Sequence, residues 1–148
     1  MVRGSSHTFS EIYLHVNWHC VSDEPMIRPE IEPKLYELIE EYCRKEKGIH
    51  YHKANGTKDH VHLVFQMEPF VILSEFLGKV KGYTSHEINK VFGSDTLKWQ
   101  RGYGIVSFSK KHLAGVVRYV DNQKEHHGEG TTNRILEMCG MEGPESHD

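Results

Sequence analysis

Residues 60–66 read HVHLVFQ, and this stretch decides the fold. Successive side chains of a β-strand point to opposite faces of a sheet. One face of this stretch receives three apolar side chains, those of Val61, Leu63 and Phe65. The other face receives His60, His62 and Val64. We therefore expect a strand that packs one face against helices and carries two imidazoles on the other.

Working outward from this strand, hydrophobic periodicity and turn residues predict the other elements. The predicted segments are a strand over 11–18, a helix from Ile31 to Gly48, a strand over 49–54, a helix starting near Pro69 or Ser74 and ending near Phe92, a strand over 102–108, and a helix from Ser109 to about Glu125. The order is βαββαβ followed by a helix. This order predicts an α+β, ferredoxin-like fold, in which two helices cover one face of an antiparallel sheet and the other face is open.

Length and composition indicate a single domain over 1–148. No apolar run approaches the roughly 18 residues that span a bilayer, and the first residues do not resemble a signal peptide. The three cysteines are an odd number without CxxC spacing, so they suggest neither a disulfide framework nor a cysteine zinc site. We expect a cytoplasmic protein with no membrane partner.

The charges are unevenly distributed along the chain, although the net charge is only −3. Residues 76–118 carry eight basic and two acidic side chains, a net charge of +6. The segments on either side, 1–75 and 119–148, are net acidic. A cationic middle segment can neutralise phosphates whatever the total charge, although a lysine-rich solvated helix face would look the same.

His60 and His62 are candidates for a metal pair, because they share one face of a strand. Two neutral imidazoles can bind a divalent ion, but a functional site needs at least one more ligand and open positions for substrate. His50 and His52 have the same spacing on the neighbouring predicted strand. They are therefore an alternative metal-binding pair, or they could hydrogen-bond to the first pair and orient it.

The last predicted helix carries Tyr119 and, one turn later, Gln123. Both lie beside the apolar stripe of that helix rather than on it, so Tyr119 is a candidate for chemistry rather than core filling. A tyrosine hydroxyl has an ordinary pKa of about 10, so as a nucleophile it needs a polarised target or a nearby base. Gln123 can reach the same ion or phosphate. A simple amphipathic surface helix remains the alternative.

At this point the sequence resembles a family, the small single-domain HUH-type tyrosine transposases. This family includes the transposases of the smallest bacterial insertion sequences and those associated with repetitive extragenic palindromes (REPs). The resemblance covers roughly residues 8–127 and leaves a polar, acidic tail over 128–148. The segments that carry it are HVHLVF from His60, RYVDNQ up to Gln123, KWQRGYG over 98–104 and LGKVKGYTS over 77–85.

The resemblance implies a metal-dependent nickase and strand transferase that acts on single-stranded DNA near hairpins. His60 and His62 match the metal ligands, Gln123 the third protein ligand, and Tyr119 the nucleophile that forms a 5′-phosphotyrosine link. The implied cofactor is Mg²⁺ or Mn²⁺. The implied assembly is a homodimer, and the active site is completed either within one chain or by the partner.

The cationic segment supplies the candidates for phosphate contacts. These are Lys79, Lys81, Lys98, Arg101, Lys110, Lys111 and Arg118. Two other functions compete with the transposase interpretation. A non-catalytic nucleic-acid-binding module could use an open four-stranded sheet with aromatic and basic side chains. A small metal sensor or store could use the two histidine pairs.

Overall fold

A computed structural model describes residues 8–125 and 133–137 of the chain. Its elements are β1 (Tyr13–His19), η1 (Val21–Asp23), α1 (Glu32–Lys45), β2 (Ile49–Gly56), β3 (His60–Met67), α2 (Leu73–Phe92), β4 (Gly104–Phe108), η2 (Lys110–His112), α3 (Leu113–Asp121) and α5 (Arg134–Glu137). The predicted order βαββαβ is therefore present, and a helix that carries Tyr119 follows it.

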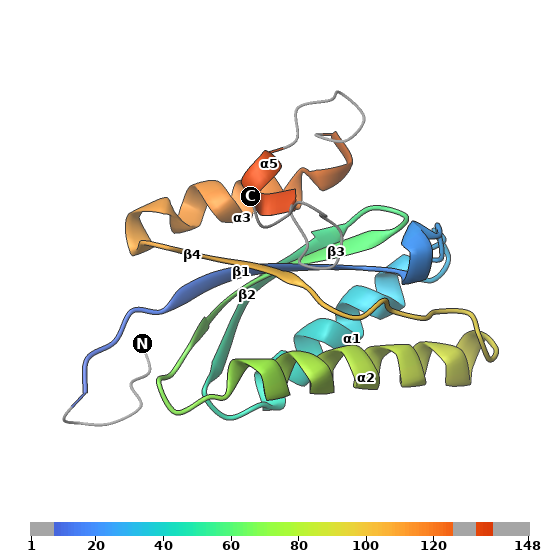
Figure 1. Cartoon of the computed structure of the whole chain (residues 1–148), viewed down its shortest axis with the longest axis horizontal. Helices are drawn as coiled ribbons and strands as arrows, with labels where there is room; N and C mark the ends of the chain where they lie inside the picture. The colour runs from blue at the N-terminus through green and yellow to red at the C-terminus, as the bar shows by residue number, and fades with distance from the viewer. Residues whose placement is uncertain (1–7, 126–132, 138–148) are drawn as a thin grey trace.

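The four strands form one sheet in the order β2-β3-β1-β4, and every neighbouring pair is antiparallel. This arrangement confirms the predicted α+β, ferredoxin-like fold. Helices α1 and α2 cover one face of the sheet, whereas α3 and α5 lie on the other (Figure 1). The second face is therefore not open as the sequence suggested. The described residues form three layers, with the sheet in the middle.

Strand β3 lies between β1 and β2, so it is buried on both faces. Val61, Leu63 and Phe65 are fully buried in the hydrophobic core formed with α1 and α2. His60 and His62 alternate with them and are also buried, because α3 and α5 cover the opposite face. The side chains of β3 thus alternate between the two faces of the sheet as predicted, but both faces are buried.

A glycine fixes the connection between α1 and β2. Gly48 has a φ of +87°, a conformation that glycine adopts without the steric cost of a Cβ atom. A Cβ there would also lie 2.6 Å from the ring of Phe70, so the space is closed. Gly48 therefore lies in the turn after the helix, as predicted, although the helix itself ends at Lys45.

The last helix is shorter than predicted. Ser109 precedes a short 3₁₀ turn over Lys110–His112, and its hydroxyl contacts the His112 ring instead of capping a backbone amide. Helix α3 then runs from Leu113 to Asp121, and Asn122 leaves the helical backbone conformation, with φ −102° and ψ +29°, before residues 123–125 become helical again. The predicted single helix to Glu125 is thus broken just before Gln123.

The core predicts the effect of one matched pair of substitutions. Ile39 on α1 is fully buried, whereas Ile72 before α2 is 58% exposed. Ile39→Ala should lower the free energy of unfolding by about 2–5 kcal/mol, because it removes buried methyl groups and leaves a cavity. Ile72→Ala should change it by no more than about 0.5 kcal/mol. Urea unfolding followed by circular dichroism measures both, and equal effects would contradict this core.

Candidate active site

The two histidines of β3 lie side by side on the face of the sheet away from α1 and α2. Their ring centroids are 5.0 Å apart. His60 stacks on His19 of β1 at 4.7 Å, because the β1–β3 register places these two residues opposite each other. His62 is fully buried and His60 is 4% exposed. The pair is therefore screened from solvent.

The Nδ1 atom of each imidazole is occupied by a partner within the chain. His60 Nδ1 lies 2.8 Å from a carboxylate oxygen of Asp59 and 3.0 Å from the hydroxyl of Thr57. His62 Nδ1 lies 2.6 Å from Nε2 of His15. Burial, and the neighbouring His62, lower the pKa of His15 to about 3, so His15 is neutral. These partners orient both rings and leave the Nε2 atoms directed toward α3 and α5.

Helix α3 brings Tyr119 to the same place. The Tyr119 ring packs edge-on against His62, with 6.2 Å between the centroids. Two contacts hold the end of α3 over β2: the Asn55 side chain donates to the Asp121 carbonyl at 3.0 Å, and Lys53 pairs with the Asp121 carboxylate at 2.9 Å. Tyr119 therefore approaches a histidine of its own chain.

Gln123, the predicted third ligand, lies next to Tyr119. Its side chain is fully buried. A hydrogen bond from Gln123 favours the ionised form of the Tyr119 hydroxyl, although this effect is smaller than the opposing ones. The break in the helix at Asn122 separates the two residues. Gln123 is thus within reach of the tyrosine, and its role as a ligand stays a prediction.

Glu137 of α5 joins the two histidines to the tyrosine. Its Oε1 atom lies 3.0 Å from His60 Nε2 and 3.1 Å from His62 Nε2. Its Oε2 atom accepts a hydrogen bond of 2.5 Å from the Tyr119 hydroxyl. Three elements far apart in the sequence, β3, α3 and α5, therefore meet at one carboxylate.

Glu137 is not among the site residues that the sequence predicts. The only signal was the short apolar stretch around it in an otherwise polar tail. That stretch marks a segment that can bury a side chain, and Leu136 is indeed only 8% exposed. The remainder of the predicted tail, 128–132 and 138–148, lies outside the described residues.

The carboxylate changes the proton affinity of its neighbours. Burial raises the pKa of Tyr119 to about 12, together with the hydrogen bond to Glu137. Burial lowers the pKa of His60, but hydrogen bonds to Asp59 and Glu137 outweigh it and raise the value to about 9. Burial raises the pKa of Glu137, yet its contacts with the two histidines and Tyr119 hold it far below its ordinary value. The site therefore has a strong preference for a positive charge between Glu137 and the imidazoles.

The competing pair on β2 is arranged differently. His50 Nε2 lies 2.8 Å from a carboxylate oxygen of buried Glu68. The register of β2 against β3 shifts between Tyr51 and Lys53, at the position of His52. Within residues 8–125 and 133–137, the converging ligand atoms of a possible metal centre belong to His60, His62 and Glu137. The second histidine pair is not part of this group.

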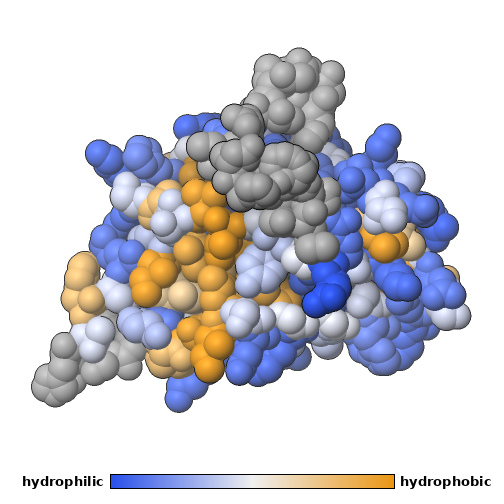
Figure 2. Space-filling model, viewed as in Figure 1, coloured by the Kyte–Doolittle hydropathy of each residue, from blue (hydrophilic) through white to orange (hydrophobic). Residues whose placement is uncertain are grey.

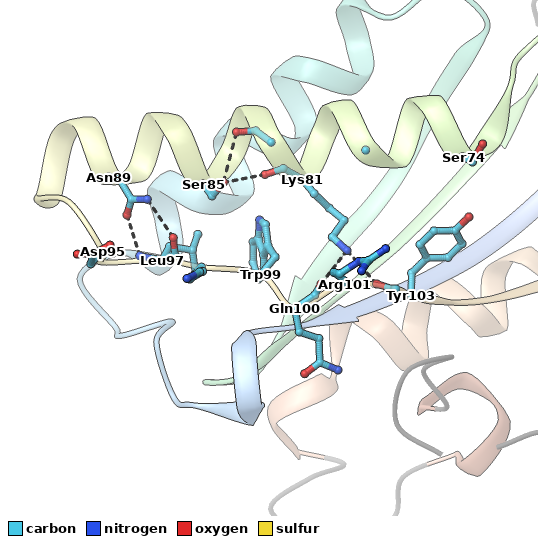
Figure 3. A pocket seen from close by; sticks show the side chains of 14 residues that line it. Ser74, Lys81, Ser85, Asn89, Asp95, Leu97, Trp99, Gln100, Arg101 and Tyr103 are labelled. Carbon is cyan, nitrogen blue, oxygen red and sulfur yellow. Dashed lines mark hydrogen bonds between the residues drawn. The ribbon is translucent and has the colours of Figure 1, made fainter. Parts of the chain in front are cut away.

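A groove of about 590 Å³ lies between α2 and the segment 95–103 (Figure 3). Lys81 reaches across it and donates to the carbonyl oxygens of Gln100 and Gly102 at 3.0 and 2.8 Å. Trp99 donates its indole N–H to the Thr84 hydroxyl at 3.1 Å. Lys81 and Trp99 therefore hold the groove together, and Lys81 has less freedom to meet a phosphate than the sequence suggested.

The other predicted basic contacts are exposed but do not form one patch. Lys98 and Arg101 line the groove. Lys79 lines a different hollow beside Phe70. Lys110, Lys111 and Arg118 are exposed on η2 and α3. The cationic segment thus presents charge at the groove, beside it and on the tyrosine helix.

Within residues 8–125 and 133–137, no helix combines the length and the apolar character that a membrane span needs.

Comparison with known proteins identifies the family. Residues 8–123 match the family model described as "Transposase IS200 like". The match covers more than half of the chain, so the protein belongs to the IS200-like transposase family. The family resemblance derived from the sequence is therefore confirmed.

Two curated relatives are transposases for insertion sequence element IS200, from Salmonella typhimurium strain LT2 and from Salmonella typhi. Each is 28% identical to this chain over 85 residues, which is 53% of this chain and 55% of the relative. The chain thus spans about half the length of the curated relatives it matches.

Two solved structures share the fold. A candidate transposase from Deinococcus radiodurans R1 superposes with a TM-score of 0.66 at 18% identity, covering 83% of this chain and 98% of the other. A REP-associated tyrosine transposase bound to a REP hairpin gives a TM-score of 0.60 at 13% identity, covering 89% of this chain and 76% of the other. At these identities the likeness establishes the fold alone.

The contact between α5 and the site predicts a change in the pKa of Tyr119. Leu136→Asp should release the segment 133–137, because it places a charge in a buried apolar position. Tyr119 then loses the Glu137 hydrogen bond and part of its burial, both of which disfavour the phenolate. Its pKa should therefore fall from about 12 toward the ordinary value of about 10.

Ultraviolet titration of the tyrosines measures this shift, with the Tyr119→Phe curve subtracted to isolate the one hydroxyl. Ile72→Asp, which places the same charge at an exposed aliphatic position, is the control. A Tyr119 pKa that stays near 12 in Leu136→Asp would contradict the docked position of α5.

Proposed function

We propose that this protein is a metal-dependent nickase and strand transferase for single-stranded DNA near hairpins. Membership of the IS200-like transposase family supports DNA cleavage and transfer. The observation that carries the proposal is the meeting of the Tyr119 hydroxyl and the Nε2 atoms of His60 and His62 around one carboxylate. A nucleophile beside a site with the donors for a divalent ion is what phosphodiester cleavage requires.

The residues present fit a divalent ion. The site offers two imidazole nitrogens whose rings are oriented from behind, and a carboxylate with a strongly lowered pKa. Mn²⁺ and Mg²⁺ accept such nitrogen and oxygen donors together with water, although Mg²⁺ prefers oxygen. We assign the ion to His60 and His62, with Gln123 as a further candidate ligand. When bound, it polarises a phosphate oxygen and stabilises the charge that develops during the displacement.

Tyr119 performs the covalent step. Its hydroxyl oxygen attacks the phosphorus of a phosphodiester and gives up its proton to a base or water. The bond from phosphorus to the 3′-oxygen breaks, the 3′-oxygen takes up a proton, and a 5′-phosphotyrosine remains. Attack by another 3′-hydroxyl on this link restores a diester and frees Tyr119. Because one diester is exchanged for another, the sequence of steps needs no nucleotide hydrolysis.

The DNA partner is inferred from the charge pattern and from a fold relative. The transposase of similar fold is described as bound to a REP hairpin. In this chain the exposed charges of Lys98 and Arg101 line the groove beside Trp99. We propose that a hairpin with single-stranded flanks contacts this groove and the basic residues of η2 and α3. A non-catalytic binding module would need the groove but not the tyrosine site.

Homodimer formation stays a prediction. Tyr119 already approaches His62 of its own chain, so the site does not need a partner for this contact. A band of hydrophobic side chains nevertheless crosses one face from α3 toward α2 (Figure 2). Leu113, Val116 and Val117 of α3 are only half-buried, and Ile105 of the edge strand β4 is 36% exposed. Such a surface is compatible with pairing of two copies.

The tyrosine gives the sharpest test of catalysis. Wild-type protein, given a panel of DNA hairpins with single-stranded flanks and Mn²⁺ or Mg²⁺, should form a covalent adduct that survives denaturing gels. Tyr119→Phe removes only the nucleophilic oxygen, so the adduct should disappear while hairpin binding remains. EDTA should abolish it as well. The control Tyr83→Phe, which removes a hydroxyl near Glu41 on α1, should leave the adduct unchanged.

Persistence of the adduct in Tyr119→Phe would show that another residue is the nucleophile. Tight binding of hairpins by the wild type with no adduct across the whole panel would favour the binding module.

The groove gives a test of DNA binding. The double variant Lys98→Gln, Arg101→Gln removes two exposed charges from the groove. It should weaken hairpin binding and reduce the slope of log affinity against log salt by about one unit per lost phosphate contact. Arg44→Gln with Lys45→Gln makes the same charge change on α1, at two residues that do not line the groove, and should leave the slope unaltered. An unchanged slope in the groove variant would show that DNA binds to another surface of the protein.

A further inference from the structure

We propose that Glu137 is itself a ligand of the divalent ion, so that the metal centre consists of His60, His62 and a carboxylate supplied by the C-terminal segment. The inference rests on the proposed function, because it requires that the two histidines bind an ion. It adds a ligand that neither the strand motif nor the tyrosine helix contains.

The distances between the donor atoms carry the first step. Oε1 of Glu137 lies 3.0 and 3.1 Å from the Nε2 atoms of His60 and His62. All three ligand atoms lie within 4.8 Å of one another. Two ligands that bind one ion at right angles, each at about 2.1 Å, are separated by about 3.0 Å. The separations between the carboxylate and the two imidazoles are those of neighbouring ligands around an octahedral ion.

The two carboxylate oxygens have different partners, which suits a ligand that binds through one oxygen. Oε1 faces both imidazoles, and Oε2 accepts the hydrogen bond of the Tyr119 hydroxyl at 2.5 Å. A carboxylate bound in this way links the ion to the nucleophile. Glu137 would then fix the position of Tyr119 relative to the ion through its outer oxygen.

The carboxylate is delivered by contacts that do not involve the histidines. The Asn17 side chain of β1 donates to the carbonyl of Leu136 at 2.7 Å. The backbone N–H of Asn133 donates to the Tyr119 oxygen at 2.8 Å. The Leu136 side chain is 8% exposed. Backbone, side-chain and apolar contacts therefore anchor α5 in the residues just before Glu137, as the support of a metal ligand requires.

The opposing interpretation is that the carboxylate fills the place of the scissile phosphate and blocks it. A blocking carboxylate would compete with DNA and contribute nothing to retention of the ion. Removal of the charge therefore separates the two interpretations. A ligand predicts weaker metal binding and slower cleavage, whereas a blocking group predicts unchanged metal binding and faster cleavage.

The experiment measures Mn²⁺ affinity of the full chain without DNA, by electron paramagnetic resonance of the free ion. Glu137→Gln should weaken Mn²⁺ binding by about tenfold or more, because it replaces a charged ligand with a neutral amide. Glu125→Gln makes the same change at an exposed glutamate and should match the wild type. His60→Ala should remove most of the binding.

Thermal unfolding with and without Mn²⁺ provides a second measurement and shows that the variants fold. Saturating Mn²⁺ should raise the Tm of the wild type and of Glu125→Gln, and raise that of Glu137→Gln much less. Wild-type affinity in Glu137→Gln, together with faster cleavage of a hairpin, would overturn the ligand assignment in favour of a blocking role. In that case loss of binding in His60→Ala would leave the proposed metal centre intact. Failure of the wild type to bind Mn²⁺ would overturn both.

Discussion

Strand β3 is hydrogen-bonded to β1 on one side and to β2 on the other, and this double pairing positions the rest of the structure. Because neighbours fix its register on both sides, alternate side chains are committed to opposite faces with no freedom to slip. Val61 and Leu63 are thereby held in the core, and His60 and His62 on the other face. The register of β3 therefore positions side chains of the hydrophobic core and side chains of the candidate site at the same time.

Buried imidazoles are costly unless their polar atoms have partners. The structure supplies such partners from adjacent positions: Asp59 and Thr57 for His60, and His15 from the neighbouring strand for His62. These contacts hold each ring in one orientation, which an apolar residue of similar size would not need. The polar neighbours therefore fix the orientation of both imidazoles, as the proposed metal site requires.

The tyrosine and the carboxylate reach the histidines from two directions. Helix α3 crosses β2 and is fastened there through Asp121, whereas α5 returns to β1 through the Asn17–Leu136 contact. Each connection is a hydrogen bond or an ion pair, yet together they bring a tyrosine hydroxyl, two imidazoles and a carboxylate to one point. The groove at α2 is built separately, by Lys81 bridging to the segment that precedes β4. The groove and the tyrosine site are thus built by different parts of the fold.

The sequence by itself determined the features that depend on local periodicity. Alternation along 60–66 predicted which side chains of β3 face the core, and the element order predicted the sheet topology. The family was predicted from the motif segments that the chain shares with it. Helical spacing placed Tyr119 beside an apolar stripe, and α3 carries it there. Only the tertiary structure decided that α3 and α5 cover the second face, that the helix breaks at Asn122, and that Lys81 supports the groove. It also decided the contact between Glu137 and His62, which are separated by 75 positions. Local patterns in the sequence indicate the periodicity of a single helix or strand. Contacts such as that between Glu137 and His62 depend on how distant elements pack, and the spacing of residues along the chain does not specify that packing.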